Sequence, residues 1–432
     1  MTVLFKNANV VDAEKGTITP DAEILVEDGK IKKISSAGKL SADKVVDVKG
    51  MYASPGLINL HAHLFGTGKP SKALGGGKAQ QRLIKLIHTP LGRKVLSLIV
   101  RKNAENELMS GVTTIRCVGD FLGSDIELKK KTEAGKGTAR GLRMFVSGHA
   151  ITVPGGHGAG TFALTSSTPG ELEKLVDDAV AAGADFIKIC ITGGVMDAKK
   201  RGEPGEVKMN TEEVKAVCDR AHALGKKVAA HVQSTLGAEI AAKGGVDTIE
   251  HGAKMTEESL AALRARGGAV VVTYTPALPL ATMDPEVTKL SEVARFNSGV
   301  VMDGMTAGAK QAAEHGLNVG MGTDASCPFC TQYNTWREAV YFSHALGVSA
   351  AEALYTITMG NALILGIDSE TGSLSEGKSA DIIFTEGDPL RDLRALGSVK
   401  IVVASGRVIT RPKIKRIKAV DEALDKLMEE LK

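Results

Sequence analysis

The sequence lacks any segment that would export the chain or anchor it in a membrane. Residues 1–6 (MTVLFK) do not resemble the apolar region of a signal peptide. No apolar run approaches the roughly 18 residues that a membrane-spanning helix requires. We therefore expect a cytoplasmic protein that does not act at a membrane.

The sequence also has little net charge and few cysteines. Its 432 residues carry a formal net charge of +4, and much of the visible excess lies in the basic run 411–418. A charge this small does not indicate a nucleic-acid or membrane partner. The five cysteines are an odd number at scattered positions, so they do not form a disulfide framework. A small-molecule partner is expected, and assembly into a homo-oligomer stays open.

Short β-strand patterns occur at both ends of the chain. Apolar runs separated by turn signals fill residues 2–52, with a turn at 27–30. Similar runs return at 380–384 and 399–409. We predict a small composite β-sandwich domain built from residues 1–55 and 365–412, followed by a C-terminal helical tail at 413–432.

Between these ends, strand-like runs alternate with helical ones, which is typical of parallel βα units. A long helical stretch at 78–109, for example, is broken at Pro90. The eight strand candidates are residues 56–63, 112–118, 142–147, 184–191, 226–232, 246–251, 268–274 and 317–324. The predicted fold class is α/β, with a (β/α)8 TIM-type barrel at 56–364 and the small β-sandwich formed from both chain ends.

Potential metal ligands lie at the ends of these strands. His61 and His63 are two residues apart, so an extended chain points both imidazoles to the same side. Alone, such a pair is more often a surface or core feature. Here, however, further candidates occur at or near the carboxyl ends of later strands, where barrel enzymes place their chemistry. These candidates are Lys188, His231, His251 and Asp324.

In this order, the six residues resemble the ligand set of the binuclear amidohydrolase superfamily. Segments 55–63 and 372–382 match the same superfamily, and the resemblance runs from about residue 3 to 410. Segments 154–158, 185–189 and 193–195 resemble one branch of it in particular. That branch contains Xaa-Pro dipeptidases, arginine or lysine carboxypeptidases and imidazolonepropionase-like proteins.

The resemblance implies two divalent metal ions, with His61, His63 and Asp324 holding one, and His231 and His251 the other. Lys188, N-carboxylated by carbon dioxide, would bridge them. A lysine inside a barrel has a lowered pKa, and its neutral amine can add carbon dioxide. Imidazole and carboxylate ligands suit zinc, with manganese, iron or cobalt as alternatives. A water between two cations becomes a bridging hydroxide nucleophile, and Asp324 would transfer its proton to the leaving amine.

Other residues carry weaker signals. The resemblance implies that His157, in the glycine-rich loop 154–160, contacts the substrate and takes part in catalysis. The alternative is an exposed histidine in a flexible loop. Tyr274 could bind a substrate carboxylate or be a core tyrosine. Arg116 could form an ion pair at the floor of the barrel or contact a ligand, and we favour the structural ion pair. Cys327 and Cys330 are expected in a loop that shapes specificity, as are loops 65–78 and 151–169.

The predicted function is a metal-dependent hydrolase of an amide bond, in a dipeptide or an N-acyl amino acid. A mononuclear deaminase or an imidazolone-type cyclic-amide hydrolase resembles this pattern but typically lacks the lysine on the fourth strand. A non-catalytic binding module would not need a complete ligand set.

Overall fold

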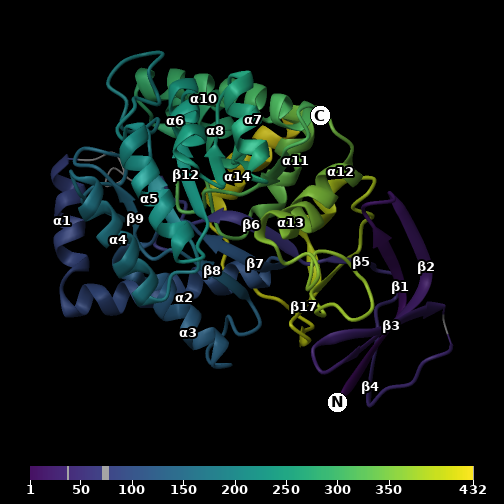
Figure 1. Ribbon diagram of the computed structural model, residues 1–432. Helices are drawn as coiled ribbons and strands as arrows, with labels where there is room; N and C mark the ends of the chain where they lie inside the picture. Colours follow the sequence, from purple (N-terminus) through teal and green to yellow (C-terminus); the bar gives the residue numbers. More distant parts are fainter. Residues whose placement is uncertain (37, 71–76, 432) are drawn as a thin grey trace.

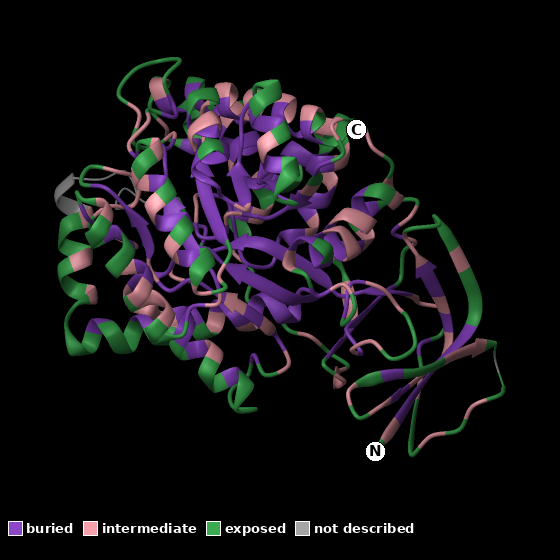
Figure 2. Ribbon diagram, in the orientation of Figure 1, coloured by how far each residue is buried: buried purple, intermediate pink, exposed green. Residues whose placement is uncertain are grey.

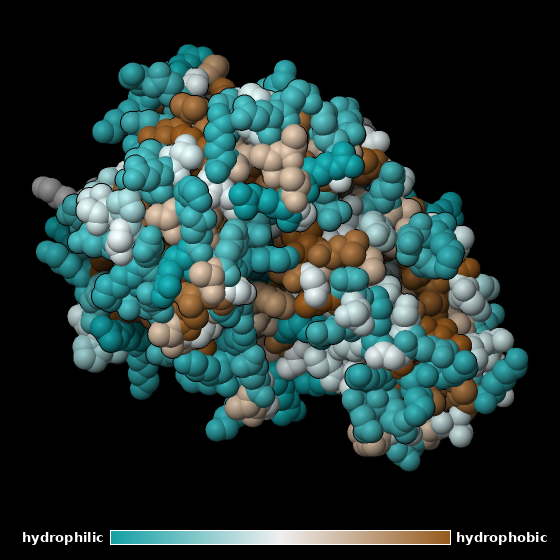
Figure 3. Space-filling view, in the orientation of Figure 1, coloured by the Kyte–Doolittle hydropathy of each residue, from teal (hydrophilic) through white to brown (hydrophobic). Residues whose placement is uncertain are grey.

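The computed structural model describes residues 1–36, 38–70 and 77–431, so residues 71–76 of the predicted loop 65–78 lie outside the described part. A larger α/β part is joined to a smaller β part (Figure 1). In the view of Figure 3, hydrophilic side chains cover most of the surface. Among the described helices, none has the length and apolarity needed to span a membrane.

Two parallel sheets form the larger part. One contains β6 (Leu57–Ala62), β7 (Val112–Cys117) and β8 (Arg143–Val146) in that order. The other runs β10-β9-β11-β12-β13-β14-β15. Its strands are β9 (Ala150–Thr152), β10 (Ala163–Thr165), β11 (Ile187–Cys190), β12 (Val228–Val232), β13 (Thr248–His251), β14 (Ala269–Val272) and β15 (Asn318–Met321). Each of the eight predicted strands is confirmed as a strand, with shorter bounds.

Backbone hydrogen bonds connect the two sheets at both edges. The amide of Asp185 donates to the carbonyl of Val146 at 2.8 Å, between β8 and the start of β11. The amides of Thr323 and Asp324 donate to the carbonyl of His61 at 3.0 and 2.8 Å. Gly322 makes this second junction possible, because a Cβ there would lie 2.3 Å from Cβ of His61. The end of β15 therefore lies directly against β6.

Helices cover the sheets, with exposed residues on their outer faces and buried residues toward the sheets (Figure 2). Pro90 stands at the first position of α2, where its missing N–H costs nothing, and Asn210 and Glu213 form a capping box on α5. The predicted helical stretch 78–109 is confirmed as two helices. The main helices are α1 (Gly77–Ile87), α2 (Pro90–Met109), α3 (Ser124–Glu133), α4 (Pro169–Ala182), α5 (Thr211–Ala223), α6 (Thr235–Gly244), α7 (Glu257–Ala265), α8 (Tyr274–Thr282), α10 (Glu292–Glu314) and α11 (Thr335–Leu346).

Strands from both ends of the chain pair in one sheet. The hydrogen-bonded order is β18-β17-β16-β5-β1-β2-β3, and β4 pairs with β1. The joining contact is the antiparallel pair β16–β5, in which Phe384 stands opposite Ala53. The rings of Phe5 and Phe384 lie 5.1 Å apart in its core. The strands are β1 (Thr2–Asp12), β2 (Thr17–Glu27), β3 (Lys30–Ser36), β4 (Lys44–Asp47), β5 (Tyr52–Pro55), β16 (Ile382–Thr385), β17 (Val399–Ala404) and β18 (Arg407–Ile409).

The C-terminal tail ends in α14 (Lys418–Glu430), which packs against the larger part. Val420 and Leu424 on one face of this helix are buried. A side-chain nitrogen of Arg337 on α11 lies 2.5 Å from the carboxylate of Asp425. The tail is therefore held by apolar packing against the core of the larger part and by an ion pair with α11.

Candidate metal centre

Three of the predicted ligands meet where β6 and β15 end. His61 and His63 extend from β6, and Asp324 follows β15. One ligand atom from each lies within 4.8 Å of the other two. The Oδ1 atom of Asp324 lies 3.5 Å from Nε2 of His61 and 3.3 Å from Nε2 of His63. This spacing suits a divalent ion with imidazole and carboxylate ligands.

Hydrogen bonds behind these side chains fix which ring nitrogen faces the cluster. Nδ1 of His61 lies 2.7 Å from Oε2 of Glu250, and Nδ1 of His63 lies 2.5 Å from the carbonyl of Gly119. Nδ1 of His251 lies 2.7 Å from the hydroxyl of Thr273. In each of these three rings, Nε2 is therefore the nitrogen that can face the cluster. Partners of this kind orient metal-binding histidines in proteins generally.

Glu250 is anchored in turn by Arg116. Two nitrogen–oxygen contacts of 2.7 and 2.8 Å join the guanidinium to the carboxylate. Burial alone would raise the pKa of Glu250, but Arg116 and His61 hold it well below its usual range. Glu250 therefore stays ionised and accepts a hydrogen bond from Nδ1 of His61. The structural role predicted for Arg116 is confirmed.

His231 and His251 come from neighbouring strands, and His251 lies between His231 and His61. In the register of β12 and β13, His231 stands opposite Glu250. The ring centroids of His231 and His251 are 4.6 Å apart, and those of His251 and His61 are 4.8 Å apart. Nε2 of His231 lies 3.2 Å from the carbonyl of Gly193, so Nδ1 is the nitrogen of this ring that could bind a metal ion.

The protonation of these groups also suits a metal. Burial lowers the pKa values of His63, His231 and His251, so the rings are neutral, which is the form that binds metals. Burial would raise the pKa of Asp324, but His61 and His63 hold it well below its usual range. The site thus offers neutral imidazoles and one ionised carboxylate.

Lys188 lies on β11 with only 2% of its surface exposed. Its Nζ atom has no hydrogen-bond partner among the described residues. Burial lowers the pKa of its ammonium group, which favours the neutral amine. A buried polar atom without a partner is costly and needs an explanation. An added carboxyl group that binds metal ions would supply the missing interactions.

Two of the candidate ligands have strained backbones. His251 has φ +62° and Asp324 has φ +50°, both in the left-handed region. For residues other than glycine this conformation costs roughly 1–2 kcal/mol each. Such strain concentrates at functional sites, where the surrounding structure enforces it.

His157 stands at the far end of the row of rings. It stacks on His231, with centroids 4.3 Å apart and planes 11° apart. Its Nδ1 lies 2.5 Å from Oδ2 of Asp197, and this oxygen also accepts a hydrogen bond from the amide of Gly194. Burial would raise the pKa of Asp197, but His157 and these hydrogen bonds lower it. Nε2 of His157 is therefore the nitrogen available to a ligand.

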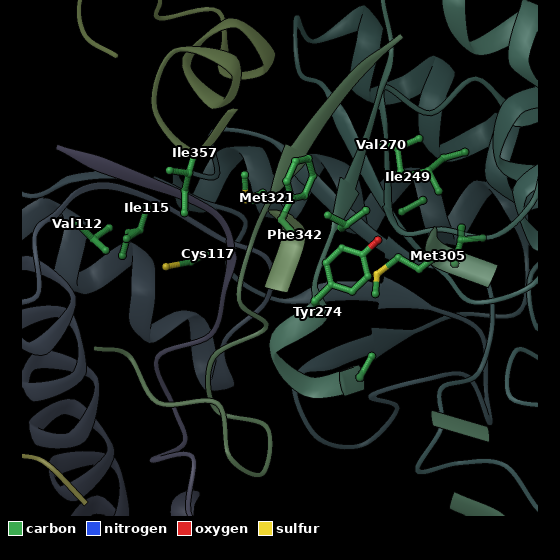
Figure 4. Close-up of a cluster of buried hydrophobic side chains, with 14 of the residues drawn as sticks. Val112, Ile115, Cys117, Ile249, Val270, Tyr274, Met305, Met321, Phe342 and Ile357 are labelled. Atoms are coloured by element: carbon green, nitrogen blue, oxygen red, sulfur yellow. The ribbon is translucent and has the colours of Figure 1, made fainter. Parts of the chain in front are cut away.

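Tyr274 is not brought to the cluster. The predicted strand 268–274 ends at Val272. Beyond it, the hydroxyl of Thr273 contacts Nδ1 of His251, and Tyr274 is the first residue of α8. The ring of Tyr274 lies among buried hydrophobic side chains (Figure 4), and its hydroxyl is 3.1 Å from that of Thr306. This placement removes the reason for expecting a substrate contact from Tyr274.

Cys327 and Cys330 lie in the turn that follows Asp324, and both are free thiols. The amide of Cys330 donates to the carbonyl of Cys327 at 2.9 Å. Nearby, the hydroxyl of Ser326 donates to the carbonyl of His63 at 2.8 Å. The turn is thus tied to the end of β6 beside the metal cluster.

The residues that sequence reasoning missed act behind the ligands. Glu250 gave a weak signal as a charged residue inside an apolar strand, next to His251. Three further groups gave no signal in the sequence, because their positions depend on chain segments without a repeating apolar pattern. They are Asp197, Thr273 and the carbonyl of Gly119.

Residues 52–409 match the model of the amidohydrolase family, and the chain belongs to this family. The chain is 37% identical to a candidate prolidase from Bifidobacterium longum, with a TM-score of 0.85 and 99% of each chain covered. It is 27% identical to a Xaa-Pro dipeptidase crystallised with methionine in its active site. There the TM-score is 0.79, with 95% of this chain and 100% of the other covered.

Two curated relatives extend the comparison. Ochratoxinase from Aspergillus niger is 25% identical over 68% of this chain, and the match spans 64% of that protein's length. Imidazolonepropionase from Treponema denticola is 24% identical over 89% of this chain and 91% of that protein. The superfamily and the branch predicted from the sequence are confirmed.

Proposed function

We propose that the protein is a metal-dependent hydrolase that cleaves an amide bond in a dipeptide or an N-acyl amino acid. The observation that carries this proposal is the cluster of His61, His63 and Asp324, together with a buried Lys188 whose Nζ atom has no hydrogen-bond partner among the described residues. Family membership supports hydrolysis, and the candidate prolidase and the Xaa-Pro dipeptidase support a peptide-like substrate.

We infer that β6–β8 and β11–β15 form one closed (β/α)8 barrel, with the site at the carboxyl ends of its strands. The hydrogen bonds between Asp185 and Val146 and between Asp324 and His61 support closure at both seams. The predicted division is retained, with the barrel at 56–364 and the small β domain at 1–55 and 365–412. A cytoplasmic location also stays a prediction.

We assign one divalent ion, expected to be zinc, to His61, His63 and Asp324, and a second to His231 and His251. N-carboxylated Lys188 would contact both. When bound, these ions would supply Lewis acidity and lower the pKa of a water molecule. Zinc is expected because imidazole and carboxylate ligands suit it.

The chain's own groups would then move protons and hold the substrate. Asp324, ionised and next to both histidines of β6, accepts a proton from the attacking water and returns it to the leaving nitrogen. Glu250 holds Nδ1 of His61, so that the ring cannot rotate away from the reacting atoms. His157, oriented by Asp197, offers Nε2 to the carboxylate of the substrate.

The test is hydrolysis of a library of dipeptides and N-acyl amino acids, each offered as the free acid and as the C-terminal amide. We expect the free acid to have a higher kcat/KM, mainly through a lower KM, because His157 recognises the carboxylate. His157→Ala should narrow this gap, whereas Tyr274→Phe, changed at a buried hydroxyl, should keep it. Equal hydrolysis of acid and amide by the unmodified protein would move the substrate toward cyclic amides.

A further inference from the structure

Aromatic side chains gather beside the metal cluster. The chain has only 10 phenylalanines in 432 residues, and three of them lie here. The rings of Phe65 and Phe162 contact that of His63, and Phe121 contacts Phe65. The rings of Phe65 and Phe162 stack with centroids 5.8 Å apart and planes 20° apart. Phe121 meets Phe65 edge-on at 4.8 Å. This concentration of rings indicates a dedicated apolar surface.

The ring of Phe162 lies between the two ends of the site. Its centroid is 5.3 Å from that of His63 and 5.7 Å from that of His157. Two glycines lie close to this ring. A Cβ on Gly119 would lie 3.1 Å from it, and one on Gly158 would lie 2.7 Å from it. The lack of a side chain at each glycine therefore leaves room for the ring in this position.

Burial distinguishes the front of this surface from its back. Phe121 is buried with 9% of its surface exposed and supports Phe65 from behind. Phe65 and Phe162, whose rings both lie next to that of His63, are by contrast only partly buried. An apolar surface left open beside a polar cluster is typical of a ligand site, where apolar walls surround a few polar groups.

We propose that Phe65 and Phe162, named here the aromatic wall, bind a large apolar side chain of the substrate. This inference rests on the proposed function and gives it a substrate class, namely dipeptides or N-acyl amino acids with one bulky aliphatic or aromatic residue. His157 takes the polar end of the substrate, and the wall next to it takes the apolar part. Stacking between aromatic rings would add binding free energy to that gained from burying apolar area.

The test compares three dipeptides, Phe-Ala, Ala-Phe and Ala-Ala, with protein loaded with zinc. We expect one of the two phenylalanine dipeptides to exceed Ala-Ala at least about tenfold in kcat/KM, as pocket contacts of this size allow. Phe162→Ala should bring this ratio close to one. The matched control is Phe296→Ala on α10, a residue that is 42% exposed, and this variant should keep the ratio. A ratio near one in the unmodified protein, or one unchanged by Phe162→Ala, would overturn the inference.

Binding without turnover separates this inference from the proposed function. In calorimetric titrations, L-phenylalanine should bind the zinc-loaded protein at least about tenfold more tightly than L-serine, and Phe162→Ala should remove the difference. If no dipeptide is cleaved but this difference is found, the proposed function fails and the aromatic wall stands. Equal affinity for the two amino acids would overturn the wall, whatever the protein hydrolyses.

Discussion

At the scale of single residues, the site is built from ligands and from the groups that hold them. The imidazoles of His61, His63 and His251 each have one nitrogen committed to Glu250, Gly119 or Thr273. Each ring is therefore oriented before any ion arrives, which lowers the entropy lost on binding. Lys188 is the exception, since nothing among the described residues bonds its amine. The proposed carboxylation would supply the missing partners of this amine.

Replacing Lys188 should remove the bridge between the two metal positions. We expect Lys188→Ala to bind about one metal ion per chain or fewer, as measured by elemental analysis after removal of free metal. Added short carboxylic acids should restore part of the second ion and of the activity, because they can occupy the space of the lost carboxyl group. Lys227→Ala is a matched control, since the Nζ atom of Lys227 lies 3.1 Å from the carbonyl of Ile364. Two ions bound to Lys188→Ala without added acid would contradict the bridge.

Replacing Asp324 should separate proton transfer from metal binding. Asp324→Asn keeps the size of the side chain and an oxygen next to His61 and His63, but it cannot accept a proton. We expect the metals to remain largely bound and kcat to fall at least about a hundredfold, the lower range for general acid–base catalysis. Single-turnover kinetics and metal analysis on the same sample measure both. A variant that turns over at nearly the original rate would show that Asp324 is only a ligand.

At the scale of elements, buried polar contacts join helices to the strands that carry the ligands. Glu107 on α2 lies 3.3 Å from Nδ2 of Asn59 on β6 and 3.3 Å from the hydroxyl of Thr335 on α11. Asn59 in turn accepts the amide of Thr323, just before Asp324. Burial raises the pKa of Glu107 to about 8. The folded protein thus keeps a proton at a position that supports the site from behind.

This raised pKa predicts how stability changes with pH. The unfolded chain releases the proton near pH 4.5, whereas the folded chain holds it up to about pH 8. Stability from this group is complete below pH 4.5 and is lost as pH rises to about 8, by about 5 kcal/mol at most. Glu107→Gln should flatten this dependence in urea unfolding, and Glu105→Gln, with a half-exposed side chain on the same helix, should not. Equal slopes for Glu107→Gln and the unmodified protein would contradict the assignment.

The sequence predicted regular elements better than the places where they end. Strand periodicity located β6 and β12 with their histidines, because alternation and apolar runs reflect burial directly. It extended the strand at 268–274 too far, since a hydrogen bond between Thr273 and His251, distant in sequence, ends β14 at Val272. For the same reason Asp197 was missed. Its place beside His157 depends on the paths of two loops, which carry no period.

At the scale of the whole molecule, the ends of the chain meet in one sheet while the site lies in the larger part. The pairing of β16 with β5 and the packing of Phe5 on Phe384 close the small sheet around its own core. β5 ends at Pro55 and β6 begins at Leu57, so the small sheet leads directly into the strand that carries His61. The small sheet therefore fixes the start of β6 but supplies no ligand.

This division predicts that damage to the small sheet lowers stability without changing the site. Phe5→Ala should lower the free energy of unfolding by about 3–5 kcal/mol, the range for buried aromatic side chains, while metal content in native buffer stays unchanged. A double-mutant cycle with Phe384→Ala should give a coupling of about 0.5–1.5 kcal/mol between the two rings. Loss of metal from the folded Phe5→Ala protein would show that the small sheet shapes the site.

The central claim is a pair of divalent ions joined by carboxylated Lys188, and native mass spectrometry of active protein prepared with zinc and bicarbonate tests it most directly. The account predicts that the intact chain carries about two zinc ions and the added mass of one carbon dioxide, and that Lys188→Ala lacks the carbon dioxide. One ion per chain would favour a mononuclear deaminase, and none would favour a binding module. Two ions with an unmodified Lys188 in fully active protein would contradict the bridge on which the account rests.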